Sequence, residues 1–226
     1  MVGIAVGLAA VLGALGVGQN PEGILAGEVT DAMSGDPVYM ARIVIGGRST
    51  IRYVDKEYRI THLRHGIHTL KVTAPGYETK TTEVAIKRGV TSLDIRLDGK
   101  EIPNLDHIIV FADSVPGVGI RLDIRFVNQG GVGIKHFPKI PMTIEAKLNV
   151  RLGTREKYTK GRLIYSGPVE LAWDSEAILG KNKGLIPKSK LHLNSETDGR
   201  YGVLEVILHT NQRDFKDTIS EVLLEW

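Results

Sequence analysis

Apolar and polar residues alternate from residue 24 onward with the period of two that is typical of half-buried β-strands. In the first such run, Leu25 and Val29 share one face. The alternation stops at a cluster of residues that favour turns, namely Asp31, Ser34, Gly35, Asp36 and Pro37. It then resumes, and we expect Val38, Met40, Arg42 and Val44 on one face and Tyr39, Ala41, Ile43 and Ile45 on the other. The pattern predicts a strand, a turn and a second strand with one buried face.

The same period continues as far as residue 98. It predicts further strands at residue 53 and within 58–60, 69–74, 82–86 and 92–97. Together with the opening strands they make the seven that a small β-sandwich needs. A turn at Asp98-Gly99-Lys100 closes this unit, and Pro103 and Asn104 mark its expected boundary.

From Leu105 the strand pattern begins again and predicts a second β-unit. Its expected strands are residues 108–111, 121–127, 144–152, 161–165 and 201–208, with 169–173 as a further candidate. Pro187 and its neighbouring lysines predict a loop over residues 180–190, and Asp198-Gly199-Arg200 predicts a hairpin turn.

The end of the chain fits two periods. The spacing of Phe215, Ile219, Val222, Leu223 and Trp226 is helical, whereas Ser220, Val222, Leu224 and Trp226 alternate as in a strand. In an all-β unit we favour the strand for residues 215–226.

Residues 1–18 contain no charged and no strongly polar side chain. As a helix they would span about 27 Å, just short of the hydrocarbon core of a bilayer. Three interpretations are open: a retained membrane anchor, which we favour; a cleaved signal peptide, which here lacks the usual basic start; and a helix buried in an assembly outside lipid. Small residues at Gly3, Gly7, Ala10 and Ala14 form a stripe that would let such helices pack closely.

The stretch around the first turn resembles the opening of the carboxypeptidase regulatory-like, or transthyretin-like, domain family, roughly G-x-V-x-D-x-x-S/T-G-x-P-V-x-x-A-x-V-x-I. The matching residues are Gly27, Val29, Asp31, Ser34, Gly35, Pro37, Val38, Ala41, Ile43 and Ile45. Residues 58–77 are similar to the second half of the family pattern, which ends in Ala74-Pro75-Gly76-Tyr77, although His68 replaces an aromatic residue and Asp55-Lys56-Glu57 replaces an Asp-Gly turn. The resemblance covers residues 23–98 and implies a β-sandwich that seldom has an activity of its own.

These observations give a fold class and a division of the chain. We expect an all-β protein of two consecutive β-sandwich domains preceded by one hydrophobic N-terminal helix. The expected parts are the helix at 1–18, a linker at 19–23, a transthyretin-like sandwich at 24–100 and an immunoglobulin-like or jelly-roll-like sandwich at 104–226.

The composition is that of an ordinary globular protein, with 42% hydrophobic and 24% charged residues and a net charge of +3. The densest basic group, Lys181, Lys183, Lys188 and Lys190, fits a solvated loop better than a nucleic-acid surface. Because the chain has no cysteine, disulfides and thiolate metal sites are excluded.

Two groups of residues are candidate metal ligands. His62 and His68, with His65 between them, would meet across strands if the segment around Gly66 formed a hairpin. Asp31, Ser34 and Asp36 offer oxygens in one loop, as calcium requires, but the family resemblance implies that they form the turn. For both groups we favour the structural interpretation and predict no metal and no cofactor.

No motif in the sequence indicates catalysis. There is no G-x-S-x-G, no H-x-x-E zinc motif and no cysteine nucleophile, and Gly130-Gly131-Val132-Gly133 lacks the helix and lysine of a phosphate-binding loop. The carboxylates Asp94, Asp98, Asp106, Asp113 and Asp123 are typical of turns and solvent faces rather than of a catalytic pair. Trp173 and Trp226 are candidates for a glycan-stacking platform, although core packing is favoured.

The sequence therefore predicts a non-enzymatic, membrane-anchored structural protein. Its two sandwiches are expected on the exterior of a cell, filament or virion, in a homo-oligomer or a larger protein assembly, without a nucleic-acid partner. The alternative is a secreted or surface adhesion module that binds a glycan or peptide, whose binding residues the sequence does not identify.

Overall fold

The structure, a computed structural model, describes residues 22–46, 48–54, 57–172, 181–194 and 196–224. Within these ranges the fold is all-β, as predicted, and contains one short 3-10 helix, Lys188–Lys190. Among the residues described, no helix is long and apolar enough to cross a membrane. The helix predicted over residues 1–18, with its stripe of small residues, lies outside the described residues.

The first unit has eight described strands rather than the seven predicted. They are β1 (Gly23–Asp31), β2 (Ala41–Ile45), β3 (Arg48–Val54), β4 (Glu57–Leu63), β5 (Gly66–Thr73), β6 (Lys80–Ile86), β7 (Gly89–Ser92) and β8 (Ile95–Leu97). One sheet has the order β4-β1-β7, with β8 also paired to β1, and the other has the order β3-β2-β5-β6. Between them lies a core that includes Leu25, Val29, Ile43, Leu70 and Leu97, each at most 1% exposed.

Two details of this unit differ from the predicted pattern. Val38 is buried and does not share an outer face with Arg42, because Met40 adopts a left-handed φ of 58° and the alternation starts only at Ala41, where β2 begins. The segment around Gly66 is not a hairpin, since β4 and β5 lie in different sheets. Inside β1 and β2 the predicted alternation is confirmed.

The second unit is built from eight described strands. They are β9 (His107–Val115), β10 (Gly119–Val127), β11 (Met142–Gly153), β12 (Tyr158–Val169), β13 (Leu171–Ala172), β14 (Lys181–Pro187), β15 (Tyr201–Thr210) and β16 (Asp214–Leu223). They form two four-stranded sheets, β13-β14-β10-β9 and β12-β11-β15-β16. A separate core fills the space between them, in which Phe126 packs edge-on against Phe137 with ring centroids 5.0 Å apart.

Two predictions for this unit are wrong. Residues 181–187 are the strand β14 and not a loop: it pairs with β10, buries Asn182 and Ile186, and carries Lys183 on its outer face. Pro187 ends the strand, where its missing N–H disturbs the ladder least. The turn at Gly199 does not form a hairpin either, since the neighbours of β15 are β11 and β16.

The prediction of a strand at the end of the chain is confirmed by β16. Its pairing with β15 is irregular: Ile219 and Val222, three residues apart on β16, lie opposite Leu204 and Gly202, which are two residues apart on β15. This bulge reverses which side chains face inward. It explains why Phe215, Ile219 and Val222 have a spacing that resembles that of a helix.

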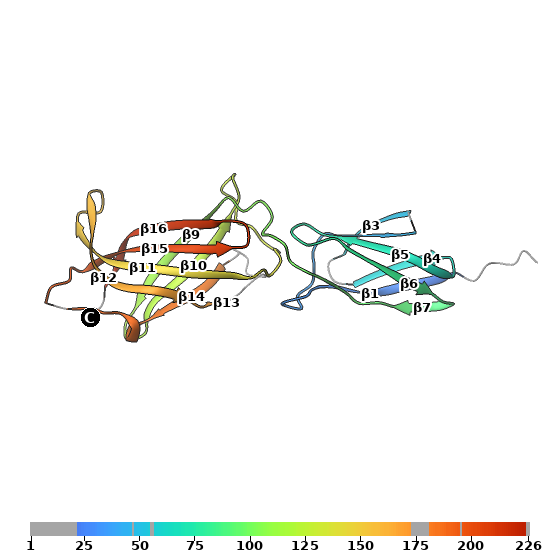
Figure 1. Cartoon of the computed structure of the whole chain (residues 1–226), viewed down its shortest axis with the longest axis horizontal. Helices are drawn as coiled ribbons and strands as arrows, with labels where there is room; N and C mark the ends of the chain where they lie inside the picture. The colour runs from blue at the N-terminus through green and yellow to red at the C-terminus, as the bar shows by residue number, and fades with distance from the viewer. Residues whose placement is uncertain (1–21, 47, 55–56, 173–180, 195, 225–226) are drawn as a thin grey trace, which may run out of the picture.

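The two units lie end to end along the long axis of the molecule (Figure 1). The turn that follows β1 points toward the second unit, and the chain passes between the units through residues 98–106. No strand pairs across the division among the described residues. The junction between the units is therefore made by loops and side chains.

Candidate functional site

Asp31 lies at the junction between the two units and is only 2% exposed. It ends β1, and its Oδ1 accepts hydrogen bonds from the backbone N–H groups of Met33 (2.8 Å) and Ser34 (2.9 Å). Gly35 completes the turn with a φ of +77°, and its N–H donates to the carbonyl of Asp31. This part of the site follows from local sequence, because an Asx turn and a left-handed glycine need no distant partner.

The second oxygen of Asp31 joins three parts of the chain. Its Oδ2 accepts a hydrogen bond from the Tyr77 hydroxyl (3.1 Å) and another from the backbone N–H of Lys139 (2.9 Å), which belongs to the second unit. Burial and the neighbouring Asp31 carboxylate raise the pKa of Tyr77, so its hydroxyl keeps the proton that it donates. The Asp31 turn and the Gly-Tyr end of the family pattern thus meet at one carboxylate, and the second unit binds to it.

Two glycines let the connecting segment pass close to both units. The carbonyl of Gly76, whose φ is +79°, accepts the N–H groups of Lys100 (2.8 Å) and Glu101 (3.1 Å). A Cβ on Gly99 would lie 2.6 Å from the carbonyl oxygen of Lys139 and 2.9 Å from Cβ of Pro138. Because real side chains do not tolerate such approaches, a larger residue at Gly99 would push the units apart.

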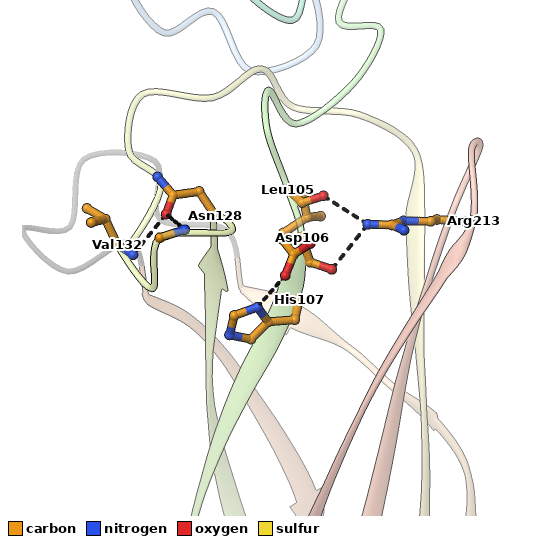
Figure 2. Close-up of polar contacts among 7 residues, drawn as sticks. Leu105, Asp106, His107, Asn128, Val132 and Arg213 are labelled. Carbon is orange, nitrogen blue, oxygen red and sulfur yellow. Dashed lines mark hydrogen bonds and ion pairs between the residues drawn. The ribbon is translucent and has the colours of Figure 1, made fainter.

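The β15–β16 turn holds the same segment from the other side, as Figure 2 shows for Arg213. The Arg213 guanidinium donates from Nη2 to the carbonyls of Leu105 and Asp106, each at 3.1 Å, and lies 4.5 Å from the centroid of the Phe215 ring. Nearby, Asn211 Nδ2 donates to the carbonyl of Lys100 (3.0 Å). The connecting segment is therefore fixed before it enters β9.

The other labelled contacts in Figure 2 order the end of the second unit that faces the first. The Asp106 carboxylate lies 3.0 Å from Nδ1 of His107. The Asn128 side-chain oxygen accepts the N–H groups of Gly130 and Val132, both at 3.0 Å. These residues include the glycine-rich loop of the sequence, which here is a turn closed by its own asparagine.

The junction is packed rather than hollow. The Tyr39 ring and the His136 ring from the second unit have centroids 4.0 Å apart. The space left beside Asp31, Tyr77 and Phe137 is about 10 Å³, room for one water at most. This geometry suits a structural clamp and offers no volume for a substrate.

A separate, open groove of about 1170 Å³ runs along the side of the second unit. Apolar side chains line it, including Val118, Met142, Leu171 and Leu185, and Met33 reaches it from the first unit. Its volume is enough for a ligand of appreciable size.

The structure does not bring the candidate histidine ligands together. His62 and His68 lie in β4 and β5 of opposite sheets; Nδ1 of His62 lies 2.9 Å from Oγ1 of Thr61, and Nε2 of His68 lies 2.7 Å from the carbonyl oxygen of Arg64. At Asp31 the two oxygens already accept four donors, so a cation would have to displace them. Over the described ranges, no group of three or more His, Asp or Glu side chains could hold a metal ion.

The remaining candidates are dispersed or lie outside the described part. Asp94 accepts the N–H of Glu28 (3.1 Å), and Asp98 is exposed in the connecting segment. Asp113 and Asp123 share one face of the paired strands β9 and β10 in the second unit, where Asp113 lies opposite Arg121 and Asp123 lies opposite Phe111. Trp173 and Trp226 are among the residues not described, so the structure does not test a stacking platform.

Comparison with known proteins addresses the first unit directly. Residues 24–98 match the family model of the carboxypeptidase regulatory-like domain. The resemblance is confirmed. It covers about a third of the chain and leaves the second unit unassigned, and a search of curated proteins found no match.

Two solved structures align with most of the chain, including both units. One is a DUF3823 family protein from Bacteroides uniformis, with 14% identity, a TM-score of 0.30, and coverage of 91% of this chain and 100% of that one. The other is BcpA, the major pilin subunit of Bacillus cereus, with 11% identity, a TM-score of 0.34, and coverage of 89% and 69%. At these TM-scores neither likeness carries an argument about function.

Proposed function

We propose that the chain is a non-enzymatic structural protein that presents two β-sandwiches, as one rigid rod, on the exterior of a cell or particle. In this proposal residues 1–18 anchor the rod in a membrane or an assembly, and the protein works as a homo-oligomer or as part of a larger protein array. The carboxypeptidase regulatory-like domain forms the part of the rod next to the anchor.

The observation that carries the proposal is the clamp at Asp31. Domains joined by a single segment usually move relative to each other unless their interface is large and apolar. Here a buried carboxylate accepts the Lys139 N–H across the division, and the β15–β16 turn binds the connecting segment. An isolated binding domain does not need a fixed angle between its units. In an array of repeated subunits, by contrast, a fixed angle keeps the spacing between subunits constant.

The apolar N-terminal segment supports the proposal from the sequence. Residues 1–18 in water would expose apolar surface at a cost of about 25 cal/mol per Å², so they need lipid or protein around them. Lipid gives no hydrophobic force between helices, and their association then depends on close contact through small residues. The stripe Gly3, Gly7, Ala10 and Ala14 provides that contact in the proposed helix.

Native mass measurement of the full chain extracted in detergent tests the proposal. We expect an oligomer, and we expect Gly3→Leu with Gly7→Leu to shift it toward monomer while the circular dichroism of the β-units is unchanged. The matched control is Ala5→Leu with Ala9→Leu, which places two leucines on the opposite side of a helix. A wild-type monomer, or a stripe variant that assembles as the control does, would contradict the assembly role.

The alternative, an adhesion module, predicts a different result. A monomeric chain that binds defined glycans on an array would support it, because a binding module needs no partner copies. An oligomer that binds no glycan supports the structural role.

A further inference from the structure

The chain enters the first unit at the end that points away from the second unit, where β1 begins (Figure 1). Gly23, the first residue of β1, pairs with Leu63 of β4 on one side and with Gly89 of β7 on the other. A Cβ on Gly23 would lie 2.8 Å from the carbonyl oxygen of Lys87, closer than real side chains approach. The entry point is therefore enclosed by two loops, one between β4 and β5 and one between β6 and β7.

Three exposed cations and two exposed apolar side chains surround this entry point. We call them the end surface: Arg64, Ile67, Lys87, Arg88 and Val90. Ile67, at 74%, is the most exposed large apolar side chain among the described residues. Cations beside protruding apolar groups suit the interface of a bilayer, where the charges stay among the headgroups while the apolar groups reach the acyl chains.

Little negative charge opposes these cations. Glu22, at the same end, lies 3.5 Å from Nε2 of His62. Glu83 lies on β6 four residues before Lys87, and its partner in register is Thr69. An anionic surface laid against this end would therefore meet three cations and the one carboxylate of Glu22.

The two loops that carry the cations are held by hydrogen-bonding contacts. Nε2 of His68, the residue that replaces an aromatic of the family pattern, lies 2.7 Å from the carbonyl oxygen of Arg64. The N–H of Lys87 donates to Oγ1 of Thr91 (3.3 Å). Loops that are already ordered lose less entropy when they bind.

The sequence brings a bilayer close to the end surface if the apolar segment inserts. Residues 19–22 separate that segment, 1–18, from the start of β1. A fully extended chain crosses this gap in at most about 18 Å. An anchor in the bilayer would thus hold the end surface within reach of the lipid headgroups.

A second copy stacked end to end would not supply the anion. At the far end of the second unit, the turn between β11 and β12 carries Arg155 and Lys157 against Glu156, so this turn is itself cationic. Acidic phospholipids, by contrast, give a membrane surface a negative potential that attracts Lys and Arg. Charge complementarity therefore favours lipid.

We propose that the end surface binds the anionic phospholipid headgroups of the membrane that holds the apolar segment. Arg64, Lys87 and Arg88 pair with headgroup phosphates, and Ile67 and Val90 enter the boundary with the acyl chains. The inference rests on the membrane form of the proposed function. It adds that the rod stands on the bilayer through its first unit and does not swing on its linker.

A fluorophore at residue 67 tests the contact. Because the chain has no cysteine, Ile67→Cys gives the full chain a single labelling site. The labelled chain is reconstituted in phosphatidylcholine vesicles with or without phosphatidylglycerol, each with lipid whose headgroup carries a nitroxide quencher. We expect stronger quenching with phosphatidylglycerol, and less as salt is raised. The control is Leu152→Cys, an exposed site at the far end of the second unit, where neither vesicle should quench.

Removal of charge locates the contact. A Lys or Arg close to an anionic membrane contributes about fivefold to binding. In the Ile67→Cys chain, Lys87→Gln with Arg88→Gln should therefore lower the ratio of docked to undocked first units about 25-fold and remove the effect of phosphatidylglycerol. Arg155→Gln with Lys157→Gln removes the same charge at the other end and should change nothing. Circular dichroism checks that each variant is folded.

Flotation of the same vesicles separates the inference from the anchor. If the chain floats with both kinds of vesicle but quenching does not depend on phosphatidylglycerol, or the Lys87 and Arg88 variant is quenched like its parent, the end surface is refuted and the anchor stands. If the chain floats with neither, the membrane form of the proposed function fails and the inference fails with it. Flotation only with phosphatidylglycerol, reversed by salt, would support the end surface and refute the anchor.

Discussion

Replacement of Asp31 tests the clamp, because one side chain serves both its turn and its contact with the second unit. In Asp31→Ala the N–H groups of Met33 and Ser34 lose their acceptor, as do the Tyr77 hydroxyl and the Lys139 N–H. A buried donor left without an acceptor costs about 1–3 kcal/mol. Because the last two donors are only partly buried but the turn is loosened as well, we expect a loss of about 2–4 kcal/mol in the free energy of unfolding.

The variant Asp31→Asn separates the two roles. Its side-chain oxygen can still accept the N–H groups of Met33 and Ser34, so the turn persists. Its amide N–H₂, however, would face the Lys139 N–H, and two donors cannot bond. The Tyr77 hydroxyl can rotate and accept from the new amide. We therefore expect a smaller loss, about 1–3 kcal/mol, confined to the contact between the units.

Urea unfolding at neutral pH measures both losses, and small-angle X-ray scattering reports the spread of shapes in the folded state. Asp98→Asn is the matched control, since it removes an exposed carboxylate at the same end of the first unit. We expect Asp31→Asn to broaden the distribution of maximum dimensions while Asp98→Asn does not. If Asp31→Asn matched the control in both stability and scattering, the carboxylate would not hold the junction and the reasoning would be refuted.

Four further predictions concern single sites. Gly35→Ala should destabilise by about 1 kcal/mol in urea unfolding, because its φ is +77° although the space for a Cβ is open; no loss would contradict the backbone argument. Asn182→Leu should keep or raise the melting temperature, since the buried Asn182 Oδ1 has no hydrogen-bond partner among the described residues and its Nδ2 lies a long 3.4 Å from the carbonyl oxygen of Ile124. A fall of several degrees would refute this. Burial opposes ionisation of Asp198, but hydrogen bonds from Arg162 and the Asn194 N–H hold the pKa of its carboxyl below the ordinary value. The stability that the ionised carboxylate contributes should therefore be complete above about pH 4 and decline as the pH falls further. If Asp198→Asn lost the same free energy of unfolding in urea at pH 7 and at pH 3, the linkage would be disproved. Finally, a chelator should leave the melting temperature unchanged, and a drop of several degrees would point to a cation at the Asp31 turn.

Local pattern was enough to predict most of the strands. Alternation depends on neighbouring residues alone, so β1, β2, β10 and β15 could be recognised before any partner was known. Where tertiary pairing overrides local signals the prediction is wrong: the lysines near Pro187 indicate a loop, yet pairing with β10 makes β14 a strand. In β16 a bulge shifts the inward-facing positions from one set of alternate residues to the other, so a single period of two does not describe the whole strand.

The clamp was only half predictable. Asp31, Ser34 and Gly35 form a turn that sequence reasoning identified, and Tyr77 ends the family pattern that matched residues 24–98. Across the division, by contrast, the partner of Asp31 is the backbone N–H of Lys139, a group that nearly every residue carries. No side-chain type marks such a contact. The role of Arg213 could not be predicted either, since its guanidinium donates to two backbone carbonyls and not to an acidic side chain.

Residual dipolar couplings of backbone amides in the full chain test the rigid rod most directly. Couplings from the strands of the carboxypeptidase regulatory-like domain and from those of the second unit should fit one common alignment tensor. Two tensors of different magnitude, one for each unit, would show that the units move independently and would contradict the account.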